Sequence, residues 1–203
     1  PSMQYDTLDF GLHIDPKSLK QSLQEAIDKA DDSVKAIILG YGLCSQAVVG
    51  LKAKNCHLVV PRVDDCIALF LGSVSAYQHQ IKKAPGTYYL TKGWIKAGDT
   101  PFDEYARLEK LYGAVRAQAI LNQILKNYTR LALINTGQYR IDDYREHTRR
   151  LAEKFNLHYE EIPGSDSFIR AMLFGPWDDR FVVVPPNKSV SFFDFKKDRP
   201  EGD

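Results

Sequence analysis

Apolar residues recur at helical spacing in several stretches of the chain. The first stretch starts at Asp15 and Pro16, a typical N-cap and first helical residue, and Leu19, Leu23 and Ile27 then follow four residues apart. This spacing places the three side chains on one face of a helix. The same pattern predicts helices over residues 16–30, 46–51, 66–82, 102–127, 144–155 and 167–174.

Short aliphatic and β-branched runs lie between these helices and predict buried strands. They span residues 34–39, 58–60, 131–134, 158–162 and 181–184. The aromatic stretch 87–99 favours a loop or a short strand. Alternating strands and helices are typical of parallel sheets, because parallel neighbours need a crossover that is usually a helix. We therefore expect an α/β fold, doubly wound, with a mostly parallel sheet and helices on both faces.

The chain shows neither a repeat nor a linker that would divide it. Its 203 residues suit one α/β domain, so we expect a single domain over residues 1–203, with a disordered tail over residues 195–203. Phe192, Phe193 and Phe195 are expected to pack onto the body or onto a second subunit. The long helix 102–127 is a second candidate for contacts within a homo-oligomer.

Composition excludes several classes of partner. The net charge of +1 gives the chain no general affinity for nucleic acid. The sequence has no apolar run near the ~20 residues of a membrane helix, and its start lacks the pattern of a secretory signal. Its three cysteines cannot all pair with one another. We therefore expect a soluble, cytoplasmic protein with reduced thiols.

Two of the cysteines lie where a predicted strand runs into a predicted helix. Cys44 follows strand 34–39, and Cys66 follows strand 58–60. Ligands of parallel sheets bind beyond the carboxyl ends of the strands, and a helix start lowers the pKa of a thiol below about 8.5. Cys56 precedes its strand instead, so we expect it to pack at the amino end of the sheet.

Two thiols at one edge predict a metal or cofactor site. Cys44 and Cys66 are candidate ligands of a soft transition metal or an iron–sulfur cluster, or else a redox or nucleophilic pair. The twenty-one residues between them match no zinc or cluster motif. The alternative is that both cysteines are buried as small hydrophobic residues.

The turn before Cys44 consists of Gly40, Tyr41, Gly42 and Leu43. A glycine turn between a strand and a helix can cradle an anion with its N–H groups, so these residues are candidate cofactor ligands. A module of this kind would bind a corrinoid, a nucleotide or a small anion, and its cysteines would be structural. The alternative is that the glycines only permit a tight turn.

The loop before Cys66 holds three charged residues, Arg62, Asp64 and Asp65. An arginine here can pair with a carboxylate or phosphate, and an aspartate can serve as a base or a hard ligand. We therefore include all three among the candidate cofactor-binding residues. The alternative is a helix cap, in which one aspartate accepts the open N–H groups and Arg62 pairs with the other.

Five blocks of the chain resemble a bacterial and archaeal family known as domain of unknown function 1638. They read LDFGLHIDPKSLKQSLQEAID, IILGYGLCSQAVVGL, LVVPRVDDCIALFLGS, PGTYYLTKGWI and FVVVPP. The resemblance runs from about Leu8 to Pro186 and includes both cysteine-bearing loops.

The resemblance implies a setting rather than a reaction. Family members are associated with anaerobes and methanogens, often beside corrinoid methyltransferase components, which implies one-carbon metabolism and such components as partners. The resemblance also implies an additional strand and helix before the LDFGLH block, so we expect that this segment is missing from the chain. A third ligand for the site could come from it.

Overall fold

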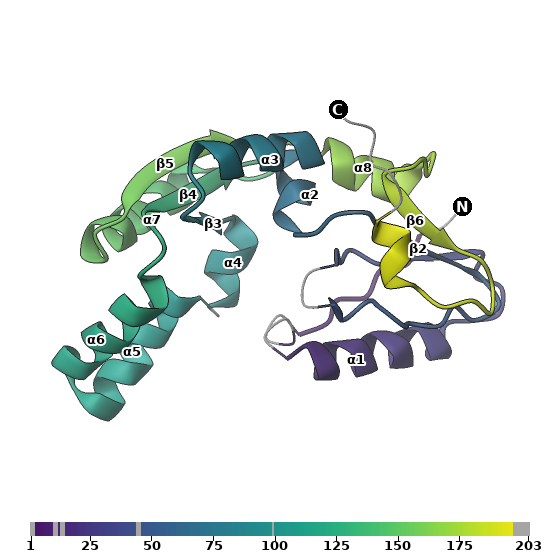
Figure 1. Cartoon of the computed structure of the whole chain (residues 1–203), viewed down its shortest axis with the longest axis horizontal. Coiled ribbons are helices and arrows are strands. Elements are labelled where there is room, and N and C mark those ends of the chain that lie inside the picture. The colour runs from purple at the N-terminus through teal and green to yellow at the C-terminus, as the bar shows by residue number, and fades with distance from the viewer. Residues whose placement is uncertain (1–2, 10–11, 13–14, 44–45, 99, 197–203) are drawn as a thin grey trace. The chain divides into compact units, whose positions relative to one another are not determined.

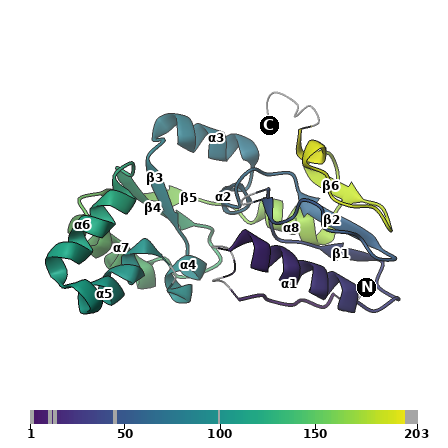
Figure 2. The ribbon, with the colours of Figure 1, turned by 60° about the horizontal axis from the view of Figure 1, so that its bottom comes forward.

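The computed structural model describes residues 3–9, 12, 15–43, 46–98 and 100–196 (Figures 1 and 2). Helices and strands alternate along them, which confirms the α/β class. The strands of the described residues form two three-stranded sheets, one mixed and one all parallel, where we expected one sheet. Of the helices in the described residues, none combines the length and apolar character that crossing a bilayer requires.

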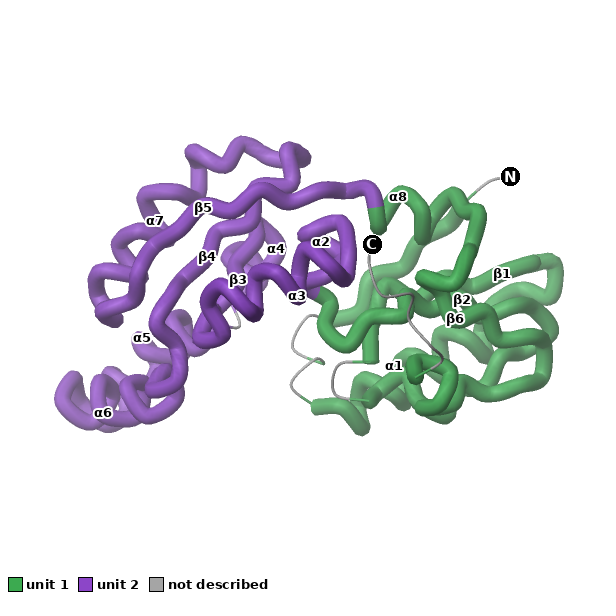
Figure 3. Tube along the Cα trace, turned by 45° about the horizontal axis from the view of Figure 1, so that its top comes forward, with its two compact units in different colours: residues 1–66, 168–203 green, residues 67–167 purple. Residues whose placement is uncertain are grey.

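The chain divides into two compact units (Figure 3). Unit 1 consists of Pro1–Cys66 and Phe168–Asp203, and unit 2 consists of Ile67–Ser167. Unit 2 is therefore inserted between two segments of unit 1, and each unit contains one of the sheets. The single domain over residues 1–203 stays a prediction.

The sheet of unit 1 has the order β1-β2-β6. Strands β1 (Ala36–Ile38) and β2 (His57–Pro61) are parallel, and β6 (Phe181–Val184) pairs with β2 in the antiparallel direction. Helix α1 (Pro16–Lys29) buries one face of this sheet. The apolar stripe of α1, formed by Leu19, Leu23 and Ile27, contacts alternate residues of the strands, namely Leu58, Val60, Val182 and Val184.

The sheet of unit 2 has the order β3-β4-β5, and all its strands are parallel. They are β3 (Thr87–Leu90), β4 (Arg130–Asn135) and β5 (His158–Pro163). Alternate residues of β4 point to opposite faces. Leu131 and Leu133 pack with residues of helices α5 (Pro101–Tyr112), α6 (Ala114–Leu125) and α7 (Asp142–Lys154). Ala132 and Ile134 pack with residues of α2 (Ile67–Leu71) and α3 (Val74–Lys83). Helices therefore lie against both faces of this sheet.

Two predicted long helices are each broken at a glycine. The helix predicted over 66–82 is divided at Gly72 (φ 86°) into α2 (Ile67–Leu71) and α3 (Val74–Lys83). The helix predicted over 102–127 is divided at Gly113 (φ 79°) into α5 (Pro101–Tyr112) and α6 (Ala114–Leu125). A positive φ interrupts the helix, and glycine adopts it readily because it lacks a Cβ. Self-association through 102–127 stays a prediction.

The helix predicted over residues 46–51 is wrong. These residues form a turn, in which Gln46 has a φ of 58°. The N–H of Gly50 donates to the carbonyl of Val190 at 2.8 Å, so it makes no helical bond. The apolar side chains of Val48 and Leu51 are buried in the core of unit 1, which explains their helix-like spacing without a helix.

The remaining helices agree more closely with the pattern. Helix α7 (Asp142–Lys154) begins two residues before its predicted start, and α8 (Ser167–Phe174) has its predicted bounds. Stretch 87–99 contains the short strand β3, one of the two alternatives that we expected. It also contains helix α4 (Lys92–Ala97), which contradicts the expectation that the stretch is not helical. The side chain of Thr91 caps α4 by accepting the N–H of Gly93.

The predicted disordered tail is wrong at its first residue. Phe195 is only 1% exposed and belongs to the core of unit 1, at the end of the 3-10 helix η3 (Phe192–Phe195). Phe193 on the same turn is 76% exposed, so only part of the aromatic cluster is buried. Residues 197–203 lie outside the described part of the chain.

Candidate functional site

The loops that follow β1 and β2 lie side by side at one edge of the sheet. Because the two strands are parallel neighbours, their carboxyl ends meet there. The N–H of Leu39 donates to the carbonyl of Val59 at 2.8 Å, and the N–H of Leu43 donates to that of Val63, also at 2.8 Å. The chain segments that lead to Cys44 and Cys66 are therefore joined by backbone hydrogen bonds. Cys44 itself lies outside the described residues.

Gly42 is required by the close contact of these loops. A Cβ on Gly42 would lie 2.6 Å from Val63 Cγ2 and 2.9 Å from the carbonyl oxygen of Val63. On Gly40 it would meet nothing nearer than Met172 Cε at 3.9 Å. Packing therefore explains the glycine at position 42, but it does not explain the glycine at position 40.

Tyr41 and Leu43 are half-buried and pack against the core of unit 1. Both side chains therefore have a structural role, and their assignment as cofactor ligands stays a prediction. Asp64 is exposed and Asp65 is half-buried. The hydrogen bond that the Arg62 side chain donates goes to neither aspartate but to the carbonyl of Phe181 on β6.

Cys66 is half-buried and immediately precedes α2. This helix has only five residues, and no α-helix follows the first loop in the described residues from Gln46 to Leu51. The helix macrodipole is a sum over aligned peptide groups, so a helix this short contributes little of it. The argument from helix starts therefore gives little support to a thiolate at either cysteine, whereas the argument from the shared sheet edge remains.

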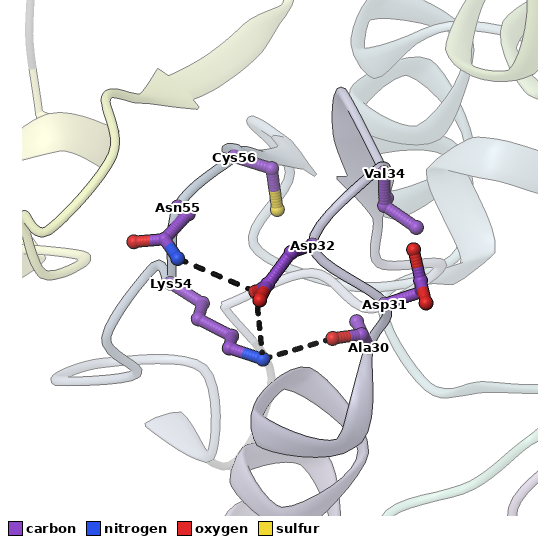
Figure 4. Close-up of a pocket in the computed structure, with 7 residues that line it drawn as sticks. All are labelled: Ala30, Asp31, Asp32, Val34, Lys54, Asn55 and Cys56. Atoms are coloured by element: carbon purple, nitrogen blue, oxygen red, sulfur yellow. Dashed lines mark hydrogen bonds and ion pairs between the residues drawn. The ribbon is translucent and has the colours of Figure 1, made fainter.

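Cys56 lies at the amino end of β2 and is 5% exposed (Figure 4). Around it, Lys54 Nζ donates to the carbonyl of Ala30 at 3.0 Å and lies 3.2 Å from the carboxylate of Asp32. The space between these side chains leaves no room for a water molecule. Burial raises the pKa of the Cys56 thiol. These features agree with the packing role that we expected.

Metal ligands do not gather in the described part of the chain. No group of three or more histidine, cysteine, aspartate and glutamate side chains is placed there to hold a metal ion. Cys66, Asp64 and Asp65 are the described donors of the predicted site, and Cys44 is its other predicted ligand.

A second feature of unit 1 was missed by the sequence analysis. A cavity of about 380 Å³ lies against β6 and the loop after it. It is lined by Arg62, Val182, Val183, Val184, Pro185, Lys188, Ser189 and Asp194. The signal in the sequence near this cavity is the proline pair after an apolar run, which predicts the end of a strand but does not indicate a binding site.

Residues 7–173 match a family model described as "Protein of unknown function (DUF1638)". The chain belongs to this family. The matched DUF1638 region contains the loops that follow β1 and β2 and all of unit 2, and it ends before β6 and Lys188. Comparisons with curated proteins and with solved structures find no match. Membership in DUF1638 confirms the family resemblance and assigns no reaction.

Proposed function

We propose that this DUF1638 protein binds a soft metal ion or a metal cofactor through the thiolates of Cys44 and Cys66. The observation that supports the proposal is the hydrogen bond between Leu43 and Val63. Leu43 is the residue before Cys44, and Val63 lies three residues before Cys66. The two chain segments that precede these cysteines, although remote in sequence, thus lie together at one edge of the sheet.

Thiolates select zinc, copper(I) and iron–sulfur centres among the biological metals. A tetrahedral metal bound by two sulfurs at about 2.3 Å requires the sulfurs to lie within roughly 4 Å of each other. The two cysteines would fill two of four positions, and Asp64, Asp65 or a bound molecule would fill others. A cubane iron–sulfur cluster needs more thiolates than these two, so a mononuclear metal fits the donor set better.

The proposal also includes a setting. Thiolate ligands persist in a reducing compartment, so we place the protein in the cytoplasm. The family resemblance suggests a role in anaerobic one-carbon metabolism, in which corrinoid methyltransferase components would be the partners. We assign no catalytic residue.

Metal analysis of anaerobically purified protein tests the proposal. We expect Cys44→Ser and Cys66→Ser each to lose the bound metal, whereas Cys56→Ser, a matched control at the opposite end of β2, should retain it. Cobalt(II) substitution would provide a second measurement, because a thiolate-to-cobalt charge-transfer band should appear in the wild type and the control only. Equal metal content in all four proteins would rule out thiolate ligation.

A second candidate is an accessory module that binds a corrinoid, a nucleotide or a small anion at the glycine turn, with structural cysteines. Gly40 favours it, because this glycine is exposed and is required neither by crowding nor by a positive φ. We expect Gly40→Val to weaken binding of such a ligand, while Cys66→Ser leaves binding unchanged. The reverse pattern would favour the thiolate site.

A further inference from the structure

Strand β6 lies at an edge of the sheet of unit 1, where β2 is its only neighbour among the described strands. The N–H of Arg62 donates to the carbonyl of Arg180, which continues the β2–β6 ladder past Pro61 and Phe181. In an antiparallel ladder, hydrogen-bonded residue pairs alternate with pairs that are not hydrogen-bonded. Val182 and Val184 therefore bond to β2, whereas the N–H and carbonyl of Val183 point away from β2. Val183 also lines the cavity of about 380 Å³.

The side chain of Arg62 reaches β6, where it makes a single hydrogen bond with the described residues. Its Nη2 donates to the carbonyl of Phe181 at 3.3 Å, which is long for an N–H···O bond. Its Nε is buried and has no hydrogen-bond partner among the described residues. Arginine carries five N–H donors, and buried donors are nearly always satisfied in folded proteins. Nε is too buried for a ligand to contact, so the Nη groups are the donors that the guanidinium group can offer to a ligand in the cavity.

The other charged groups of the cavity leave an excess of positive charge. Lys188 is exposed and takes part in no ion pair in the described part of the chain. The carboxylate of Asp194 accepts the N–H of Ser191 at 2.8 Å as part of a capping box, so η3 holds it in place. Two cations and one carboxylate thus surround the cavity, together with the hydroxyl of Ser189.

We propose that this cavity binds a small molecule through an oxyanion group, a carboxylate or a phosphate, held between Arg62 and Lys188. The guanidinium group matches the geometry of such an anion, and Lys188 and Ser189 supply further donors. The volume lies in the range of roughly 300–1,000 Å³ that is usual for small-molecule sites. The site differs from the thiolate site, and it stands whether or not Cys44 and Cys66 bind a metal.

Titration calorimetry on the full chain tests this site, with inorganic phosphate and succinate as separate probes and sodium chloride at equal ionic strength as the reference. We expect saturable binding of at least one probe, and the preferred probe distinguishes phosphate from carboxylate recognition. Lys188→Met should weaken binding about threefold and Arg62→Met about tenfold, since a charge-assisted hydrogen bond is lost. Arg150→Met, on an exposed arginine paired with Glu146 in unit 2, is the matched control and should bind as the wild type does.

Two results would overturn the proposal. One is heat that never saturates, or that equals the chloride reference, for both probes. The other is equal affinity in the wild type and Lys188→Met. Circular dichroism of each variant reports its folding, and if Arg62→Met does not fold, the exposed Lys188 decides the outcome alone.

Discussion

The backbone N–H of Leu43 donates to the carbonyl of Val63 at 2.8 Å and joins the loops that leave β1 and β2. The bond is possible because the residue before Leu43 is a glycine, which lets the chain at position 42 lie directly against Val63. The loop pairing, and with it the approach of the two cysteine-bearing segments, therefore depends on a missing side chain.

Gly42→Ala should destabilise the protein, because its new Cβ would overlap both the side chain and the carbonyl oxygen of Val63. We expect a loss of about 1–3 kcal/mol in the free energy of unfolding, as for other overpacked sites. Gly40→Ala is the matched control, since its Cβ has room, and it should change stability by less than about 1 kcal/mol. Urea unfolding of both variants measures the difference, and equal midpoints would contradict the crowding argument.

Arg130 joins β3, β5 and α3 by hydrogen bonds at the amino end of the parallel sheet of unit 2. It is 3% exposed and donates to Thr87 Oγ1 at 2.7 Å, to Glu160 at 2.6 Å and to Gln80 at 2.9 Å. Arg130→Met should cost about 3 kcal/mol, because it removes three hydrogen bonds of a buried side chain, one of them to the buried Thr87. Arg107→Met removes an exposed pair within α5 and should lower stability much less, because solvent screens such a pair. Comparable losses in the two variants would show that Arg130 has no special role.

The carboxyl group of Glu160 should make the free energy of unfolding depend on pH in the acid range. Hydrogen bonds from Lys83 and Arg130 hold the pKa of its carboxyl below the ordinary value of 4.5. The folded state therefore favours the ionised form, so this contribution is present above pH 4.5 and is lost as pH falls through the lowered pKa. Thermal unfolding between neutral and acid pH should show a steeper fall in stability for the wild type than for Glu160→Gln. Parallel curves would contradict the linkage.

Tyr88 should produce the opposite dependence at alkaline pH. Its ring packs edge to face against Phe102 and Tyr128, and burial, with Tyr128 and Asp103, raises its pKa to about 12 from 10.0. The folded state favours the neutral phenol, so stability is complete below pH 10.0 and falls as pH rises toward 12. We expect Tyr88→Phe to reduce this alkaline loss. Ultraviolet titration should also show one late phenolate in the wild type that the variant lacks.

Local signals in the sequence predicted most elements of the fold. Asp15 caps α1 with its side chain, and Thr100 and Asp103 form the capping box of α5, so both helix starts were visible from a few adjacent residues. Strand β6 has the predicted bounds, because a short apolar run ends at a proline pair. The position of Cys66 in the loop after β2 was visible from a local pattern of the same kind, whereas its role as a metal ligand stays a prediction.

The tertiary structure alone decided how these elements combine. The antiparallel pairing of β2 with β6, the separation into two sheets and the reach of Arg62 to Phe181 all join residues that are remote in sequence. Their stability depends on which surfaces are buried together, and hydrophobic periodicity does not specify the partner. The sequence by itself thus determined the α/β class and the two cysteine-bearing loops. Pairing between distant strands determined that those loops meet and that a basic cavity lies along β6.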